Sequence, residues 1–582
     1  MSVTRTLFTR QSSGLVREVS VANALFFNTA AFIGGTLGGA YGIAVLAGVP
    51  VVVLGLVTNW SVVAFIVGAF CVLLALIFAS LTTVMPRSGG DYVFTSRIIP
   101  KVGPFLGWLE SWMLAFASIA LLQFETALTL RGVQMEGRII GIGTGSDFFN
   151  NANNWFTEGS TGDVTGIPGM LAGLVVLAVV AFVVLQPTRT FHKIVTWLTI
   201  FGIGGWVVMA IMGLLTFDAG SFAANLPKYA GGITVDQLAK AAGDAGLTGT
   251  SFSFGPVDSY TWPFFLMAGV MLFQFIGFQY SAYISGEVRG NVTRGILMAV
   301  LGALVLAVLM NSIYAEMLPR RLGLDPQTGW AGAFWGYVGS PPGLPMGQPN
   351  YFQLVGAVAR PDLWPIWAVV GAASTLFPFL LMPVYVIFIS RMALAWSLDR
   401  QVPEWLGEVS ERLRAPANAI IATLAMAVIF LLFSNFPILK VVGLGALAPS
   451  ADPALDGKLN LVASAWFTIL ASSLSWINPG INAILARFTR PDLVKDAPFI
   501  KWLPLIGIVW LAFTVSLYWF AGLGPIISNL KKSNPLSYLN SSGVTFVGII
   551  LVIGIVWYVV RSIGNRRAGV ETELMYKMLP PD

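Results

Sequence analysis

The feature that most constrains this chain is a series of twelve apolar runs, each long enough to cross a hydrocarbon layer of roughly 30 Å as a helix. Charged residues make up only 10% of the 582 positions, against roughly 25% in soluble domains. Because lipid offers no hydrogen-bond partners, a backbone inside it must form helices or closed barrels, and barrel strands of about 10 residues would be shorter than these runs. The sequence therefore predicts an all-α membrane protein with twelve transmembrane helices, at 22–48, 60–84, 104–130, 168–186, 192–216, 262–285, 294–318, 365–397, 417–436, 460–485, 501–522 and 543–561.

An even number of spans puts both termini on the same side of the membrane, and the loop charges predict which side. With the N-terminus inside, 22 of the 33 Lys and Arg residues fall in cytoplasmic segments, as the positive-inside rule requires. We therefore expect a multi-pass protein of the cell (plasma) membrane with both termini cytoplasmic. The long outer segments 131–167, 217–261 and 319–364 are rich in Gly, Asn, Asp, Ser and Pro, and they are too polar to cross lipid.

Composition also argues against several classes of protein. The chain has one histidine, His192, and one cysteine, Cys71, so a His/Cys metal site is nearly excluded. Lys and Arg are scattered through loops instead of clustered on one face, which disfavours nucleic acid as a partner. No H-E-x-x-H, G-x-S-x-G or G-x-x-x-x-G-K-[ST] stretch is present. We expect no catalytic residues, no metal and no cofactor; the expected partners are a small-molecule substrate and the lipid bilayer, with a homo-oligomer left open.

Two of the spans contain glycine segments that favour an interrupted helix. The first has Ile33 to Gly39 (IGGTLGG), and the sixth has Phe273 to Gln279 (FQFIGFQ). Glycine in a helix interior costs up to about 1 kcal/mol relative to alanine and lets backbone amides approach a ligand. Interrupted spans in corresponding positions of two halves point to a transporter site. The alternative is that small residues only permit tight helix packing.

Three motifs, in order along the chain, resemble the amino acid-polyamine-organocation transporter family. The segment from Pro86 to Phe94 (PRSGGDYVF) looks like the family's PRSGGEY segment. The segment from Phe273 to Asn291 is similar to the family pattern in the sixth span, and Arg391 to Pro403 (RMALAWSLDRQVP) is followed by Ala415-Pro416. The resemblance covers roughly residues 20 to 490 in register.

The resemblance implies a core of the bacterial leucine-transporter type, with a 5+5 inverted repeat and two extra helices. It divides the chain into an N-terminal cytoplasmic tail at 1–21, a first repeat at 22–216, an extracellular loop at 217–261, a second repeat at 262–485, spans 11 and 12 at 486–561, and a C-terminal cytoplasmic tail at 562–582. The implied function is secondary transport or exchange of amino acids by alternating access, and not an enzyme reaction.

The same resemblance implies a substrate site at the bilayer midplane. The first break would give amides and a hydroxyl to the carboxylate of an amino acid, the second break would give carbonyls to its amino group, and two aromatic residues would line the site. The substrate-binding residues so implied are Ile33, Gly34, Gly35, Thr36, Phe275, Ile276 and Gly277, with the aromatics Phe273 and Tyr385.

The chain departs from the family where ion coupling is concerned. A family glutamate in the sixth span is replaced by Gln279, which cannot titrate. The position of a coupling lysine in the fifth span falls on Gly205 or Trp206. The hydroxyl pair Ser374-Thr375 lies almost two turns from the position expected for sodium ligands.

Ionisable groups inside a membrane are functional suspects. Glu110 and Glu125 of the third span are therefore candidate coupling residues. For Glu125 we favour the plainer interpretation, an ion pair with Arg131 near the outer end. Arg391, Asp399 and the charges that follow them are expected in a solvated loop after span 8.

Two other functions remain open from the sequence. A polyamine or other organic cation transporter would need a deep acidic group, which Glu125 alone offers. A nutrient sensor with the same core would have lost transport, and the long outer segments favour it mildly.

Overall fold

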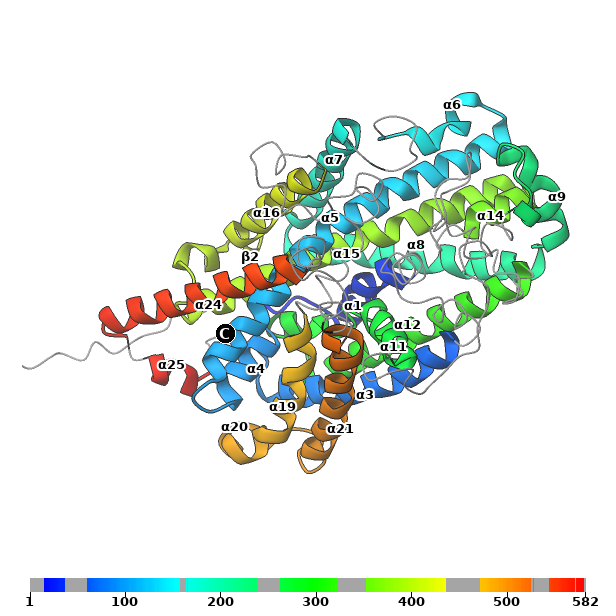
Figure 1. Ribbon diagram of the computed structural model, residues 1–582. Coiled ribbons are helices and arrows are strands. Elements are labelled where there is room, and N and C mark those ends of the chain that lie inside the picture. Colours follow the sequence, from blue (N-terminus) through cyan, green and yellow to red (C-terminus); the bar gives the residue numbers. More distant parts are fainter. Residues whose placement is uncertain are drawn as a thin grey trace, which may run out of the picture.

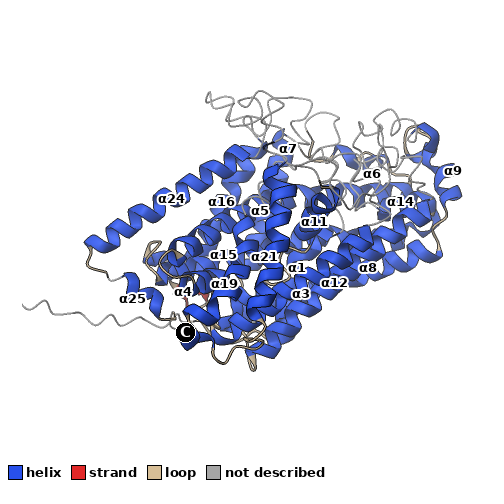
Figure 2. Ribbon diagram, turned by 60° about the horizontal axis from the view of Figure 1, so that its bottom comes forward, coloured by secondary structure: helices blue, strands red, loops and turns tan. Residues whose placement is uncertain are grey.

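A computed structural model of the protein describes residues 15–36, 60–157, 164, 166–237, 262–322, 352–435, 472–524, 527, 544–570 and 572–579. The described part is almost entirely helical (Figure 2). Its long helices are α1 (Val21–Thr36), α3 (Trp60–Val84), α5 (Gly103–Thr144), α7 (Gly166–Val184), α8 (Thr188–Leu215), α11 (Pro263–Gln274), α12 (Val292–Leu322), α15 (Trp364–Leu398), α16 (Ala417–Asn435), α19 (Ser473–Thr489), α21 (Leu503–Leu517) and α24 (Val544–Arg567).

Shorter elements lie toward the two ends of the bundle or connect the long helices. These are α4 (Asp91–Ile98), α6 (Asp147–Asn150), η2 (Ala152–Asn154), α9 (Ala219–Tyr229), η3 (Tyr280–Glu287), α14 (Phe352–Ala359), η4 (Pro361–Leu363), η5 (Glu404–Gly407), α20 (Pro491–Val494), η7 (Tyr518–Leu523) and α25 (Thr572–Lys577). Strands β1 (Val409–Ser410) and β2 (Ala415–Pro416) form one short antiparallel pair. We call the end of the bundle that carries α4, α20 and α25 the α4 end, and the end that carries α6, α9 and α14 the α9 end (Figure 1).

The two longest helices, α5 and α15, pack against each other through the middle of the bundle (Figure 1). Helix α1 packs against α8, α12 and α15, and η3 lies against α1, α12 and α15. Helices on the outside leave large apolar side chains exposed, for example Phe182 on α7 and Leu215 on α8, with exposed fractions of 66% and 78%. Such an apolar exterior is what a helix bundle in lipid requires, because lipid tails are as apolar as the side chains that face them.

Every expected span overlaps a described helix. Eight of the described helices are long and apolar enough to cross a membrane, and α1 and α16 are shorter apolar helices. The chain is therefore a multi-pass helical membrane protein. The count of twelve spans, the 5+5 repeat and the domain limits stay predictions, because parts of several spans lie outside the described residues.

Helix α5 differs from its expected limits. It continues through Thr144, into the segment 131–167 that we expected as an outer loop. The extension is polar but protected: a Cβ at Gly137 would meet Ala152 and Trp155, and one at Gly143 would meet Trp364. Because this part of α5 packs on protein instead of lipid, its polar composition does not end the helix.

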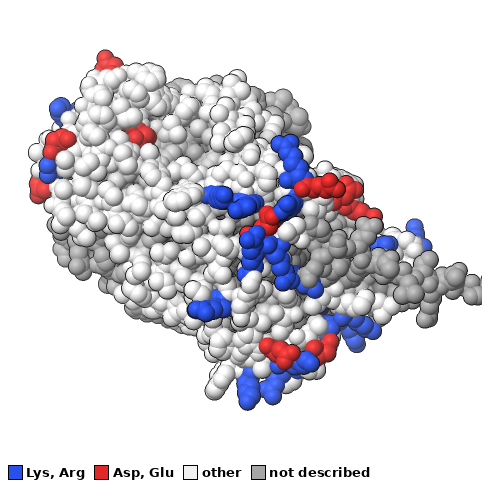
Figure 3. All heavy atoms as spheres, turned by 180° about the vertical axis from the view of Figure 1, so that it is seen from behind, with Lys and Arg blue, Asp and Glu red and all other residues white. Residues whose placement is uncertain are grey.

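Most basic side chains visible in Figure 3 lie at the α4 end, a smaller group of charges of both signs lies at the opposite end, and a broad band between the two is free of charge. Exposed basic residues at the α4 end are Arg17, Lys101, Arg189, Lys193, Arg289, Arg294, Arg412, Arg414, Arg487, Lys495, Lys501, Arg566, Arg567 and Lys577.

Candidate functional site

The sixth span is interrupted, as the glycine pattern predicts. Helix α11 ends at Gln274, five residues of turn follow, and the chain resumes as the 3₁₀ helix η3 at Tyr280. Gly277 has a φ of 99°, in the region that side chains disfavour. A Cβ added there would lie 2.4 Å from the Cβ of Ala31 on α1. The interruption therefore lies directly against α1, at a distance that only glycine allows.

The interruption leaves peptide groups without partners. Neither the N–H nor the C=O of Ile276 makes a hydrogen bond within the described part of the chain. Phe275 and Ile276 are buried, with exposed fractions of 0% and 4%. A buried peptide group without a partner is costly, so a polar ligand at this point would gain hydrogen bonds that the protein does not make for itself.

The first span behaves differently over its described length. Helix α1 runs through Gly34 and Gly35 to Thr36 without interruption, so the predicted break does not form at these two glycines. The rest of the glycine segment, 37–39, lies outside the described residues, as do the side chains of Ile33 and Thr36. A break beyond Thr36 stays a prediction.

Polar and aromatic side chains surround the interruption, and we call Gln274, Tyr280, Tyr283 and Tyr385 the central polar cluster. The rings of Tyr280 and Tyr385 have centroids 5.5 Å apart, and Tyr280 also packs on Phe388 at 4.3 Å. All four members of the cluster are buried, with exposed fractions of 0%. Their hydroxyl and amide groups have no hydrogen-bond partner within the described residues.

Tyr385 lies near the interruption, because Tyr280 begins η3 and packs against it edge to face. Phe273 lies on α11, one residue before its end, but its side chain is outside the described part. Sequence reasoning missed Gln274, Tyr280 and Tyr283. The available signal was their position: they are polar residues in an otherwise apolar span that also holds Gly277.

Glu125 lies buried in α5 with an exposed fraction of 1%. The expected ion pair with Arg131 is wrong: none joins the two residues in the described chain, and Oε2 of Glu125 has no hydrogen-bond partner there. The two residues lie six positions apart, about 1.7 turns, and so point to different sides of the helix. Tyr385 on α15 is close enough to interact electrostatically with Glu125.

The positions where relatives place a coupling lysine or sodium-binding hydroxyls contain no such group. At Gly205 a Cβ would lie 2.1 Å from the Cβ of Ala373, so α8 and α15 touch where proton-coupled relatives place a lysine. Ser374 and Thr375 lie roughly 15 Å along α15 from Tyr385, at 1.5 Å per residue. The hydroxyl of Thr375 donates to the carbonyl of Gly371 at 3.0 Å.

Buried ion pairs close the α4 end of the bundle. Arg97 on α4 pairs with Asp399 at 2.7 Å, and Tyr92 donates to the same carboxylate at 2.8 Å. Arg391 on α15 binds both oxygens of Glu287, at the end of η3, at 2.7 and 2.8 Å. The expectation that Arg391 and Asp399 lie in a solvated loop is wrong: their exposed fractions are 1% and 0%.

The segment before α4 wraps over η3. The N–H of Gly89 donates to the carbonyl of Tyr283 at 3.2 Å, and Ser285 donates to the carbonyl of Arg87 at 3.2 Å. Gly90 has a φ of 52°, and a Cβ there would lie 2.8 Å from the ring of Tyr283. The glycines of the PRSGGDYVF motif thus let this segment pass closely over the half-helix that leads from the interruption.

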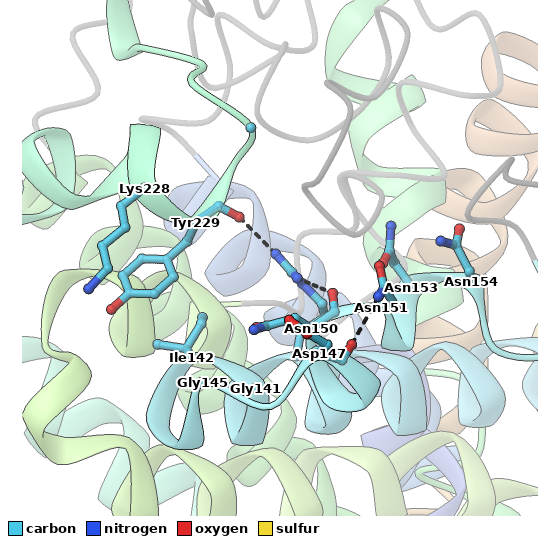
Figure 4. A pocket seen from close by; sticks show the side chains of 12 residues that line it. Gly141, Ile142, Gly145, Asp147, Asn150, Asn151, Asn153, Asn154, Lys228 and Tyr229 are labelled. Carbon is cyan, nitrogen blue, oxygen red and sulfur yellow. Dashed lines mark hydrogen bonds between the residues drawn. The ribbon is translucent and has the colours of Figure 1, made fainter.

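A separate cavity of about 700 Å³ lies at the α9 end, between α5, α6 and α9 (Figure 4). Arg138 on α5 crosses one wall and donates to the carbonyls of Asn150 and Tyr229. Lys228 and Asp147 also line the cavity. It contains none of the substrate-binding residues expected from the sequence.

A helix bundle with an apolar exterior, an interrupted inner helix and unpartnered polar groups beside it is the architecture of a membrane transporter. The family model for amino acid permeases matches residues 25–550. The chain therefore belongs to the amino acid permease family. A comparison with curated proteins found no match.

Among solved structures, the chain is similar to a manganese transporter of Eremococcus coleocola. One structure is of a variant of that transporter in which alanine replaces a glutamate. It is 15% identical, with a TM-score of 0.43, and the match covers 94% of this chain and 95% of that one. A second variant, in which alanine replaces a histidine, is 16% identical, with the same TM-score and coverage. A complex with an aromatic bis-isothiourea compound is 15% identical, with a TM-score of 0.42 and coverage of 97% and 99%. Identities and TM-scores this low say nothing about what the present chain carries.

Proposed function

We propose that this protein moves amino acids across the cytoplasmic membrane by alternating access, as a secondary active transporter or exchanger. The observation that carries the proposal is the interrupted sixth span, where the peptide group of Ile276 is buried without a partner beside α1. An amino acid brings both charges that such a site can bind, since unpaired carbonyls attract its ammonium group and unpaired amides its carboxylate. Membership of the amino acid permease family supports this choice of substrate.

In the proposed complex, the amino group donates to the unpaired carbonyl of Ile276 and to the second lone pairs of the Phe275 and Gly277 carbonyls, each of which already accepts one backbone hydrogen bond. Amides from the end of the first span, within Ile33–Thr36 or just beyond it, would bind the carboxylate. Phe273 and Tyr385 would cover the side chain of the substrate. Tyr280 and Gln274, which sequence reasoning missed, would add hydrogen bonds, because their polar atoms have no partner in the described chain.

We also propose that the α4 end faces the cytoplasm of the cell, with both termini on that side. The exposed Lys and Arg residues of this end support the assignment (Figure 3), since basic loops stay on the cytoplasmic side. The ion pairs of Arg97 with Asp399 and of Arg391 with Glu287 would then form the inner gate, closed in this conformation.

Thermal unfolding of the purified protein tests the substrate class. A ligand that binds only the folded state at about 100 times its Kd stabilises that state by about 2.7 kcal/mol. We expect at least one of the twenty amino acids to raise the melting temperature and to be taken up by proteoliposomes. Absence of both effects across all twenty would refute the proposal, and binding without flux would favour a sensor instead.

Glu125 favours a second candidate function, transport of polyamines or other organic cations. It is the deep acidic group that such a substrate needs, it lacks an ion-pair partner in the described chain, and it lies close to Tyr385 of the central polar cluster. Competition separates the two candidates. If polyamines are substrates, unlabelled spermidine should block the uptake of a radiolabelled substrate by the wild type, and Glu125→Gln should abolish that block. If only amino acids are substrates, spermidine should leave the uptake of radiolabelled amino acids by the wild type unchanged.

A further inference from the structure

Two carboxyl groups meet in the interior of the α4 end, where α4, α5, α19 and η3 converge. Asp91 is the first residue of α4 and Glu110 lies two turns into α5. Both side chains have exposed fractions of 0%, and they lie within hydrogen-bonding reach of each other. Neither residue belongs to the central polar cluster or to the inner-gate ion pairs.

The hydrogen bonds of this pair leave one oxygen unpartnered on each side. Oε2 of Glu110 accepts from Thr95 at 2.7 Å and from Asn478 of α19 at 2.8 Å. Asp91 Oδ1 accepts from the N–H of Tyr92 at 2.9 Å. Asp91 Oδ2 and Glu110 Oε1 have no donor within the described residues. A single proton held between these two oxygens would give both of them a hydrogen bond.

The charges around the pair give it no counter-ion. In the part of the chain that the structure describes, no Lys or Arg forms an ion pair with either carboxyl group. Arg97 and Arg391, the buried cations of this end, are each bound to another carboxylate. The other titratable groups that face the pair are Tyr280 and Tyr283 of η3, while α19 contributes the neutral amides of Asn478 and Asn482.

Two buried carboxyl groups this close cannot both carry a charge without a cation, so they titrate as one unit. We propose that Asp91 and Glu110 together hold one exchangeable proton and form the proton-coupling site of the transporter, an inference that rests on the proposed transport function. Burial raises the pKa of Asp91 to about 6, so the closed pair loses its first proton near that pH and keeps the second, shared proton above it.

The position of the pair supplies the coupling. The segment before α4 packs over η3, and α4 itself packs on α5 and α19, so both carboxyl groups are kept from water. The proton is therefore retained while the α4 end is closed. Opening of that end separates α4 from η3 and α19 and admits water, which stabilises the charged form and releases the proton. Tyr283 faces Asp91 and lies 5.7 Å from Tyr280 of the central polar cluster, measured between ring centroids. Substrate binding and proton release therefore act on the same half-helix.

Infrared spectroscopy of the purified full-length protein tests for the shared proton without any substrate. Wild-type protein should show the carbonyl stretch of a protonated carboxyl group at acidic pH, and this band should disappear as the pH is raised. Asp91→Asn and Glu110→Gln should each remove or shift it. Glu404→Gln, which alters an exposed carboxylate of η5 at the same end, is the matched control and should leave it in place.

Proteoliposomes test the coupling, with a mixture of the twenty radiolabelled amino acids as the probe. The measured quantity is the ratio of uptake with an imposed inward proton gradient to uptake without it. This ratio should exceed one for the wild type and for Glu404→Gln, and it should fall to one for Glu110→Gln. Wild-type protein without a titrating carboxyl band, or variants that keep both the band and the gradient effect, would overturn the proposal. Wild-type protein that takes up no amino acid but loses the band in both variants would refute the amino acid function and leave the proton site standing.

Discussion

Replacement of Gly277 by alanine tests the interrupted helix directly. The new Cβ would lie 2.4 Å from the Cβ of Ala31 and 3.2 Å from its carbonyl carbon, and the residue would have to keep a φ of 99°. Backbone strain of this kind costs about 1 to 3 kcal/mol, and overpacking costs about 1 to 3 kcal/mol more. We therefore expect Gly277→Ala to destabilise the protein by about 2 to 6 kcal/mol and to abolish uptake.

A second substitution separates the two costs. Ala31→Gly removes the atom that lies 2.4 Å away but leaves the unfavourable φ. The double variant should recover the overpacking part, about 1 to 3 kcal/mol, while the strain remains. The size of this recovery is the interaction energy of the double-mutant cycle.

The assay is thermal unfolding in detergent, followed by uptake into proteoliposomes. Gly564→Ala is the matched control: this glycine lies in α24, and a Cβ there meets nothing within 4 Å. It should be neutral or stabilise the protein by up to about 1 kcal/mol, because alanine is the better helix former. A Gly277→Ala protein that melts with the wild type and still transports would show that α1 and the interruption do not touch.

Three further predictions concern the α4 end. Glu287→Gln should cost about 3 to 5 kcal/mol, because the buried charge of Arg391 then loses its counter-ion. The additional change Arg391→Met should recover much of the lost melting temperature, and a double variant no more stable than Glu287→Gln would refute this. Tyr576→Ala removes a ring whose centroid lies 5.1 Å from the guanidinium of Arg97, and it removes the hydroxyl that accepts a hydrogen bond from Gln401. This variant should make α25 more sensitive to limited proteolysis than Tyr576→Phe, which keeps the ring. Equal cleavage of the two variants would contradict the prediction. Burial raises the pKa of Asp91 from 3.8 to about 6, so the stability that its protonated form contributes is full below pH 4 and is lost as the pH rises through about 6. Melting temperatures from pH 4 to 7 should therefore fall less in Asp91→Asn than in the wild type, and an equal fall would refute the assignment.

The apolar runs were sufficient to predict the helices, because only a long apolar helix satisfies its backbone in lipid. The residues at which helices end were less predictable, as α5 shows. Its polar extension to Thr144 packs against other parts of the protein, and the local sequence gives no indication of that packing. The interruption at Gly277 was predictable for a local reason, since glycine adopts a positive φ far more readily than other residues do. The first glycine segment has the same composition, yet α1 continues through Gly34 and Gly35, so glycine permits an interruption without imposing one.

The buried charges of the α4 end could not be assigned from the sequence. Arg391 and Asp399 follow an apolar span and precede a run of charged residues, a pattern that is typical of a solvated loop. Their burial depends on partners far along the chain, Glu287 for the first and Arg97 for the second. Pairing of this kind is set by how α4, η3 and α15 pack, and no spacing within one segment encodes it.

The half-helix η3 physically connects the candidate substrate site with the inner gate. Residues three apart eclipse each other in a 3₁₀ helix, so Tyr280 and Tyr283 lie on one side of η3, the first against Tyr385 and the second against Asp91. At its other points η3 is fixed: Ser281 exchanges two hydrogen bonds with Asn28 of α1, at 2.6 and 3.0 Å. Because one short element makes all these contacts, a ligand that shifts η3 at the interruption would also change the packing around Asp91. The half-helix alone is then enough to couple the candidate substrate site to the carboxyl pair of Asp91 and Glu110.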